Sequence, residues 1–304
     1  MKAKGGTELM GERIERDCNQ SLLQYFQIIH SRPRELDPER KKILVLHDLA
    51  QDPEVQHLKD GGWQNYDKLV FVSHWQQQMY NLILGVPYSA GVVMRNAIEP
   101  IPEHEKPDDK IRLIYYSTPH RGLDILYAAF NQLAKEHDNI ELNVFSSFQL
   151  YGWEQRDEPY KELFDLLKAH PKINYHKSVS NDRIREEIQR SHIFAYPSKW
   201  QETSCLCLIE AMSGGLLSVH SSLAALPETS LGMTQMYGYV EGPSHHANLF
   251  YANLKRAVMH FETHRGRSII SQNTRGVKSV ADSVYNWNNR KYEWNDLLKS
   301  TLTW

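Results

Sequence analysis

The sequence has little cysteine, no long apolar run and no excess of charge of either sign. Its 304 residues include three cysteines, too few for the disulfide framework of a small secreted domain. No stretch approaches the roughly 18 consecutive apolar residues of a membrane span, and residues 1–6 lack the apolar stretch of a signal peptide. We therefore expect a cytoplasmic protein with no transmembrane segment, and peripheral contact with a membrane stays open.

The balance of charge excludes a strong electrostatic partner. The chain has 35 Lys and Arg against 37 Asp and Glu, a formal net charge of −2, and basic residues are mixed with acidic ones. No basic block of the kind that binds nucleic acid or anionic lipid is present, so we expect no nucleic-acid partner. Cys205 and Cys207 stand two apart in a predicted helix and therefore point to different faces. We expect them to be buried and inert, and we expect no metal site.

Strand-like apolar runs alternate with amphipathic segments over most of the chain, which predicts βαβ units, parallel sheets and an α/β fold. The predicted strands cover residues 27–30, 43–46, 69–72, 91–94, 111–116, 141–145, 173–175, 193–196 and 216–219. The predicted helices cover residues 10–26, 75–84 and 122–137, and residues 244–304 are expected to be largely helical.

A charged segment with three prolines, residues 100–109, interrupts this alternation. It indicates an interdomain linker, with a surface loop as the alternative. We therefore expect two Rossmann-like doubly wound domains facing a cleft, at residues 1–107 and 108–283, and a terminal helix at residues 284–304. Ligands of such sheets bind at the carboxyl ends of strands, and candidate residues are therefore expected there.

Two carboxylates, Glu202 and Glu210, flank the predicted start of a helix. Ser204 is a suitable N-cap, and Gly214 with Gly215 ends the helix. A helix N-terminus offers unpaired N–H groups to a diphosphate, and carboxylates accept hydrogen bonds from sugar hydroxyls. The pair thus suits a sugar nucleotide, whereas on spacing alone two surface carboxylates remain the alternative.

Glu202 and Glu210, separated by seven residues and followed by residues 211–215, resemble the E-x7-E motif of retaining GT-B glycosyltransferases of family 4. Residues 195–198 and 226–229 are also similar to that family. In the family, the first Glu contacts the donor sugar near the reacting centre and the second binds the ribose hydroxyls. The resemblance assigns these roles to Glu202 and Glu210, and it places Glu228 near the donor phosphates.

A second motif follows the first strand after the linker. Residues 116–124 resemble the family's segment that ends in Lys/Arg-Gly-Leu-Asp, and Arg121 matches its basic residue. A cation at a strand end stabilises the leaving diphosphate, where negative charge grows; the alternative is an exposed residue at a helix start. The family often has a second basic residue five or six positions earlier, where this sequence has tyrosines. Ser117 or His120 is the candidate to compensate.

Fainter similarities to the family cover the remaining segments. By this resemblance, Val179 and Ser180 contact the nucleobase through backbone groups, and Gly5 and Gly6 form a glycine-rich loop near the donor phosphate and acceptor. His47 matches a His near the reacting sugar in some members. Residues 285–294 are similar to the helix that crosses back to the first domain.

The glycine-rich loop begins at residue 5, whereas the family has a β-strand before it. We therefore expect a short N-terminal domain that lacks the usual first strand. A partner or an oligomer is expected to cover the exposed sheet edge, unless the start of the protein is missing.

The resemblance implies transfer of a hexose-like sugar from a UDP- or GDP-sugar to a hydroxyl acceptor, with retention of configuration and with no metal or cofactor. A non-catalytic sugar-nucleotide-binding or scaffold protein of the same fold is the first alternative. A GT-B epimerase or phosphorylase is the second.

Overall fold

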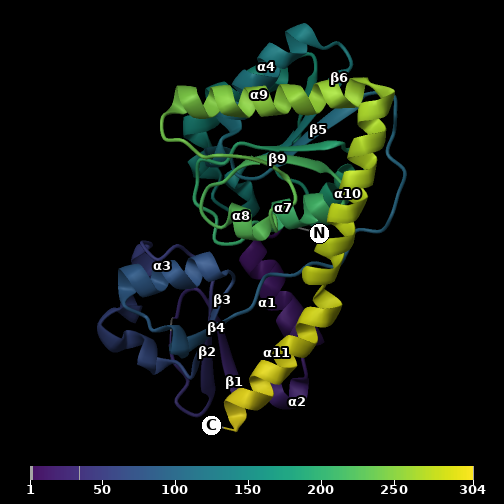
Figure 1. The fold of residues 1–304 in the computed structure, drawn as a ribbon. Coiled ribbons are helices and arrows are strands. Elements are labelled where there is room, and N and C mark those ends of the chain that lie inside the picture. The colour runs from purple at the N-terminus through teal and green to yellow at the C-terminus, as the bar shows by residue number, and fades with distance from the viewer. Residues whose placement is uncertain (1–2, 34, 304) are drawn as a thin grey trace. The chain divides into compact units, whose positions relative to one another are not determined.

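The computed structural model describes residues 3–33 and 35–303, which form two compact units. One unit holds a six-stranded sheet and comprises Met1–Gly5, Pro100–Trp200 and Cys207–Val284. The other holds a four-stranded sheet and comprises Gly6–Glu99, Gln201–Leu206 and Tyr285–Trp304. We call them the six-stranded and the four-stranded unit, and Figure 1 labels their elements.

The four-stranded sheet is parallel throughout, and its strands lie in chain order. They are β1 (Phe26–His30), β2 (Lys41–Leu46), β3 (Lys68–Phe71) and β4 (Gly91–Val93). Successive residues of β2 point to opposite faces, because strand side chains alternate. Ile43 and Val45 pack with α1 (Gly6–Asp17) and α11 (Trp287–Leu302). Leu44 packs on the other face with α3 (His74–Leu84) and the 3₁₀ segment η1 (Pro53–Asn65).

The helix predicted over residues 10–26 is wrong in its extent. It is divided into α1 and the short α2 (Gln20–Leu23), and β1 already begins at Phe26. The cause is Asn19, whose side chain accepts a hydrogen bond from the backbone N–H of Ser21 and so starts a new helix. The described residues before α1, 3–5, contain no strand.

The six-stranded sheet is also parallel, with the strand order β10-β9-β8-β5-β6-β7. Its strands are β5 (Ile111–Tyr116), β6 (Ile140–Phe145), β7 (Ile173–Tyr175), β8 (Ile193–Tyr196), β9 (Leu217–Ser221) and β10 (Gln235–Tyr237). The strand of this sheet that comes first along the chain, β5, pairs with both β6 and β8. The chain therefore builds the sheet outward from β5 in both directions, which creates a topological switch point between β5 and β8.

Helices cover both faces of this sheet. They are α4 (Leu123–Glu136), α5 (Lys161–Ala169), α6 (Asn181–Arg190), α7 (Leu206–Ser213), α8 (Leu226–Thr229), α9 (Pro243–Glu262) and α10 (His264–Val284). Right-handed crossovers put α4 and α5 on one face and α6 and α7 on the other. The long helix α9 lies against α4 (Figure 1). Strand β10 was missed from the sequence because its three residues, Gln235–Tyr237, form no apolar run.

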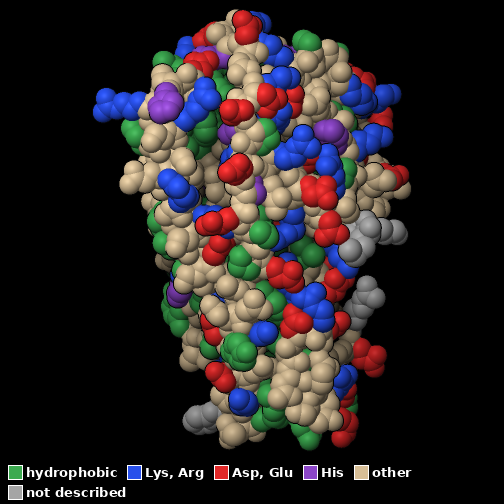
Figure 2. Space-filling model, turned by 90° about the vertical axis from the view of Figure 1, so that its right-hand side faces the viewer, with side chains coloured by type: hydrophobic (Ala, Val, Ile, Leu, Met, Phe, Trp, Pro, Cys, Tyr) green, Lys and Arg blue, Asp and Glu red, His purple; other side chains and the backbone are tan. Residues whose placement is uncertain are grey.

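Lys and Arg lie interspersed with Asp and Glu on the face that Figure 2 displays, which agrees with the nearly balanced composition. Within the described residues, none of the helices has both the length and the apolar character needed to cross a membrane.

Candidate functional site

Several predicted donor residues of the six-stranded unit follow the carboxyl ends of its strands. Ser117 comes directly after β5, Ser180 lies in the turn after β7, and Glu228 lies in α8 after β9. Parallel strands end at a common edge of the sheet, so the fold gathers these loops at one edge.

The loops after β5 and β8 meet closely at the switch point. Gly122 caps α4 with φ of +95°, and a Cβ added to it would stand 2.0 Å from the carbonyl oxygen of Pro197. Only glycine fits such an approach. The hydroxyl of Tyr116 donates to the Cys207 carbonyl at 2.5 Å, and the Cys207 thiol donates to the Tyr116 carbonyl at 3.1 Å. The start of α7 is thus fixed beside the end of β5.

Arg121 stands at this junction, in the 3₁₀ turn η3 (Pro119–Arg121) just before α4. Its neighbour His120 stacks on Phe148 at 5.3 Å between ring centroids and meets Trp200 edge-on at 4.8 Å. Burial, with the nearby positive charge of Arg121, lowers the pKa of His120 to about 4. His120 is therefore neutral at physiological pH and offers a hydrogen bond rather than a second positive charge.

Helix α7 begins later than predicted. It starts at Leu206 instead of directly after Ser204, so Ser204 is not the N-cap, and Glu202 lies four residues before the first helical residue. The reason lies in the preceding Thr203. Its hydroxyl donates to the His47 carbonyl at 2.8 Å, and its own carbonyl accepts from the Ser73 hydroxyl at 2.7 Å. These bonds hold residues 201–205 in a non-helical conformation within the four-stranded unit. The predicted stop is confirmed, since α7 ends at Ser213.

Glu210 lies in the second turn of α7 and forms an ion pair with Arg185 of α6, at 3.5 Å between Nη1 and Oε1. Both side chains are largely enclosed, with 14% of Glu210 and 24% of Arg185 exposed. The pair fixes the carboxylate and offsets its charge, since a lone buried carboxylate is costly. The sequence analysis missed Arg185, because α6 is amphipathic and mostly charged and gives no pattern that marks one residue.

Residues 4 and 5 lie against the start of α6. The backbone N–H of Lys4 donates to Asn181 Oδ1 at 2.9 Å, and Asn181 Nδ2 donates to the Lys4 carbonyl at 3.1 Å. Ser180 is the N-cap of α6 and accepts from the Arg183 N–H. The fold thus brings Gly5 close to the turn that contains Val179 and Ser180.

A second cation missed from the sequence, Lys199, follows β8 at the same edge and forms an ion pair with Asp124 at 2.7 Å. Its position directly after a predicted strand was the available signal.

The four-stranded unit holds the remaining predicted residues. His47 follows β2, Glu202 is 5% exposed, and Gly6 begins α1. A Cβ on Gly6 would stand 2.9 Å from Leu206 Cδ1, so this turn and the start of α7 approach closely. The Thr203 contact places the backbone of residues 202–204 beside His47.

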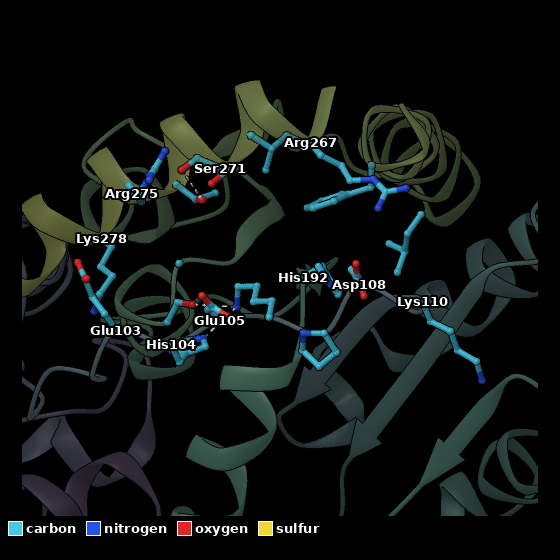
Figure 3. Close-up of a pocket in the computed structure, with 18 of the residues that line it drawn as sticks. Glu103, His104, Glu105, Asp108, Lys110, His192, Arg267, Ser271, Arg275 and Lys278 are labelled. Atoms are coloured by element: carbon cyan, nitrogen blue, oxygen red, sulfur yellow. Dashed lines mark hydrogen bonds between the residues drawn. The ribbon is translucent and has the colours of Figure 1, made fainter. Parts of the chain in front are cut away.

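A pocket of about 820 Å³ lies at the other edge of the six-stranded sheet. Its lining includes Ile111 at the start of β5 and His192 just before β8, which are the amino ends of strands. Figure 3 shows Arg267, Ser271 and Arg275 of α10 on one side and linker residues on the other. No predicted donor residue lines this pocket. The pocket at the amino edge of the sheet is therefore separate from the predicted donor residues.

Two lysines of this pocket are engaged in holding the linker and α10. Lys106 Nζ donates to the carbonyls of Ser191 at 2.6 Å and Gly214 at 3.0 Å, which end α6 and α7. Lys278 Nζ donates to the Ser213 carbonyl at 2.7 Å and pairs with Asp282. Burial, with the nearby positive charge of Lys278, lowers the pKa of Lys106 to about 7. In the described part of the chain, no three His, Cys, Asp or Glu side chains gather as a metal site.

Residues 97–247 match the model of the family described as "Glycosyl transferases group 1". That region is a glycosyltransferase group 1 domain. It contains Ser117, Arg121, Val179, Ser180, Glu202, Glu210 and Glu228. Gly5, Gly6 and His47 lie outside it.

Two curated proteins are similar in sequence. Lipopolysaccharide 1,2-N-acetylglucosaminetransferase of Salmonella typhimurium is 23% identical over 281 residues, which are 88% of this chain and 69% of that protein. The gpi3 subunit of phosphatidylinositol N-acetylglucosaminyltransferase of Schizosaccharomyces pombe is 23% identical over 118 residues. That match covers 39% of this chain and 24% of the subunit.

Solved glycosyltransferase structures share the fold. A glycosyltransferase from Rickettsia africae has a TM-score of 0.69 at 14% identity, over 98% of this chain and 80% of its own. Sucrose-phosphate synthase of Thermosynechococcus elongatus has a TM-score of 0.67 at 13% identity, over 98% of this chain and 79% of its own. Anabaena HepE in complex with UDP-glucose has a TM-score of 0.63 at 13% identity, over 87% of this chain and 72% of its own. The predicted α/β fold with two parallel sheets is therefore confirmed as that of GT-B glycosyltransferases.

Proposed function

We propose that this protein transfers a sugar from a nucleotide-sugar donor to a hydroxyl acceptor, and that the donor diphosphate binds at the carboxyl edge of the six-stranded sheet. The observation that carries the proposal is the junction of β5 and α7 inside the glycosyltransferase group 1 domain. There, the backbone N–H groups at the start of α7 and the guanidinium of Arg121 supply the positive potential that a diphosphate needs.

Each predicted residue then has a role that its position supports. Arg121, with Ser117 beside it, stabilises the charge that grows on the leaving diphosphate. Glu210, held by Arg185, accepts hydrogen bonds from the ribose hydroxyls. Glu228 and the turn at Val179 and Ser180 complete the nucleotide site.

The remaining residues are proposed to serve the sugar. Glu202 positions the donor sugar, His47 contacts it near the reacting centre, and Gly5 and Gly6 allow close approach of the backbone to phosphate and acceptor. In this proposal the reaction proceeds with retention, as in family 4, and protein cations and helix termini replace a metal.

UDP-N-acetylglucosamine is the donor to test first. Both curated relatives are named as N-acetylglucosamine transferases, and HepE is described in complex with UDP-glucose. We propose a UDP-sugar ahead of a GDP-sugar on this basis. The place of action is proposed to be the cytoplasm, with peripheral membrane contact and a partner at the sheet edge of the four-stranded unit as further expectations.

Thermal unfolding with UDP, GDP, ADP and their sugar conjugates tests the donor site. A ligand at about 100 times its Kd stabilises the native state by about 2.7 kcal/mol, which raises Tm by several degrees. We expect such a shift with one nucleotide and its loss in Arg121→Ala. Arg275→Ala, which removes the same side chain at the opposite edge, is the matched control and should keep the shift.

Glu210→Ala sharpens the assignment, because it should weaken nucleotide binding by roughly 1–3 kcal/mol. Unchanged affinity in that variant would exclude the ribose role. Product analysis then separates the reactions. Binding without transfer or donor hydrolysis would indicate a non-catalytic protein, whereas an epimerised donor or a sugar 1-phosphate would indicate the other GT-B chemistries.

A further inference from the structure

Two histidines meet at the carboxyl edge of the four-stranded sheet. His30 ends β1 and His47 follows the neighbouring strand β2. His30 Nδ1 lies 3.2 Å from His47 Nε2, and the two rings stack with 5.5 Å between centroids and 24° between planes. The distance is that of a hydrogen bond, so one ring donates a proton and the other accepts it.

Both rings are neutral at physiological pH. Burial lowers the pKa of His30 to about 4, and burial with the neighbouring His30 lowers that of His47 to about 3. A single proton therefore lies between the rings, and its position fixes both tautomers. If His30 Nδ1–H donates, then His47 carries its own proton on Nδ1. If His47 Nε2–H donates, then His30 carries its proton on Nε2.

The packing of Gly11 favours the first arrangement. Gly11 lies in α1 against the edge of the His30 ring, and a Cβ added to it would stand 3.2 Å from Nε2. His30 Nε2 has no hydrogen bond to a described residue, and the close approach of the Gly11 C–H groups to this atom favours a lone pair there over an N–H. His30 is therefore assigned the Nδ1–H tautomer and donates to His47 Nε2.

We propose that His30 is a positioning residue, which holds His47 as a neutral Nδ1–H donor aimed at an oxygen of the bound sugar or acceptor. Within the described chain, His47 Nδ1 has no hydrogen-bond partner, which leaves this donor for a substrate. The proposal rests on the proposed function only for the identity of that oxygen. The tautomer itself is a property of the free protein.

The tautomers are read directly from long-range ¹H–¹⁵N correlation spectra of ¹⁵N-histidine-labelled protein near pH 7.5, with His47→Gln used for assignment. We expect His47 to show a protonated Nδ1 and an unprotonated Nε2. In His30→Leu, the His47 signals should move to a mixture of tautomers, because the fixed donor is gone. The reverse tautomer of His47 in the unmodified protein would overturn the proposal.

Activity with UDP-N-acetylglucosamine, measured as transfer or as donor hydrolysis, gives a second readout. We expect His30→Leu to lower kcat about tenfold, the effect of one hydrogen bond, with a smaller change in the donor KM. His30→Asn should recover part of the loss, since its amide N–H can occupy the place of Nδ1–H. His57→Leu is the matched control in the same unit, where the His57 ring bonds only the Glu54 carbonyl.

The two proposals fail in different ways. If His30→Leu keeps the full kcat, the positioning role is wrong while the transferase function stands. If no sugar nucleotide turns over in the unmodified protein, the proposed function and the sugar-directed role of His47 are both wrong. The spectra then still decide whether His30 sets the tautomer.

Discussion

The two sheets are both parallel, yet they differ in where their first strand lies. In the six-stranded sheet the first strand, β5, is internal, and the chain winds away from it on both sides. In the four-stranded sheet the first strand, β1, is at the edge, and the strands follow in chain order. Only the former has a switch point, where adjacent loops diverge and leave a crevice for a ligand.

This difference decides what each unit offers chemically. At the switch point, backbone groups line the proposed donor site, because Gly122 allows the loop after β5 to approach Pro197 and the start of α7 lies beside it. The described strands of the four-stranded sheet form no switch point, and the chemistry that we propose for this unit comes from side chains of adjacent strands, as in the pair of His30 and His47. We therefore expect the proposed donor site of the six-stranded unit to be most sensitive to substitutions that shift the backbone. The proposed chemistry of the four-stranded unit should be most sensitive to substitutions of side chains.

The strongest test of this comparison is Gly122→Ala. The new Cβ would lie 2.0 Å from the Pro197 carbonyl oxygen, and the φ of +95° is unfavourable for alanine. We expect the free energy of unfolding to fall by about 3 kcal/mol or more, since strain and a backbone clash combine. Denaturant unfolding measures this loss.

Gly152→Ala is the matched control, because it has a similar φ of +73° with nothing within 4 Å of the added Cβ. It should cost only about 1–2 kcal/mol, the strain of a left-handed conformation alone. Equal losses in the two variants would mean that the close approach at the switch point contributes nothing.

The α/β class and nine of the ten strands among the described residues follow from apolar periodicity, because buried parallel strands are apolar runs such as residues 43–46. The position of Ser117 directly after β5 follows for the same reason. The start of α7 did not follow, since Ser204 is a good N-cap by composition, and tertiary bonds from Thr203 prevent the helix from starting there.

Contacts between residues far apart in the chain could not be predicted from the sequence either. Arg185 and Glu210 are 25 positions apart on two helices, and His30 and His47 are brought together only by the register of β1 with β2. Each residue alone resembles an ordinary polar residue, and only the fold shows that they share a hydrogen bond or an ion pair.

The next test concerns the dependence of stability on acid pH in the six-stranded unit. His220 in β9 is fully buried, and burial lowers its pKa to about 4 although its bond to the Ser221 carbonyl opposes the shift. Between pH 6.5 and about 4, the unfolded chain binds a proton that the folded chain does not, so stability falls as the pH falls. Each such histidine contributes a slope of up to about 1.4 kcal/mol per pH unit.

His220→Asn should therefore reduce the dependence of the free energy of unfolding on pH below 6.5, measured by urea titrations at pH 7, 6 and 5. His245→Asn, an exposed histidine in α9, is the control and should leave the slope unchanged. The same slope in all three proteins would show that His220 is not held neutral.

The smallest effect on stability is expected from Gly11→Ala, which isolates the side-chain chemistry of the four-stranded unit. Alanine favours the helix by about 1 kcal/mol over glycine, while its Cβ would stand 3.2 Å from His30 Nε2 and push the ring by a few tenths of an ångström. These effects oppose each other, so the free energy of unfolding should change by less than about 1 kcal/mol. The tautomer signals of His47 should nevertheless change, because the hydrogen bond from His30 lengthens.

Gly276→Ala in α10, where nothing lies within 4 Å of the added Cβ, should stabilise the protein and leave His47 unaffected. If Gly11→Ala behaves like Gly276→Ala in both respects, then the Gly11 contact does not hold His30, and the tautomer must be set by another feature of the sheet edge.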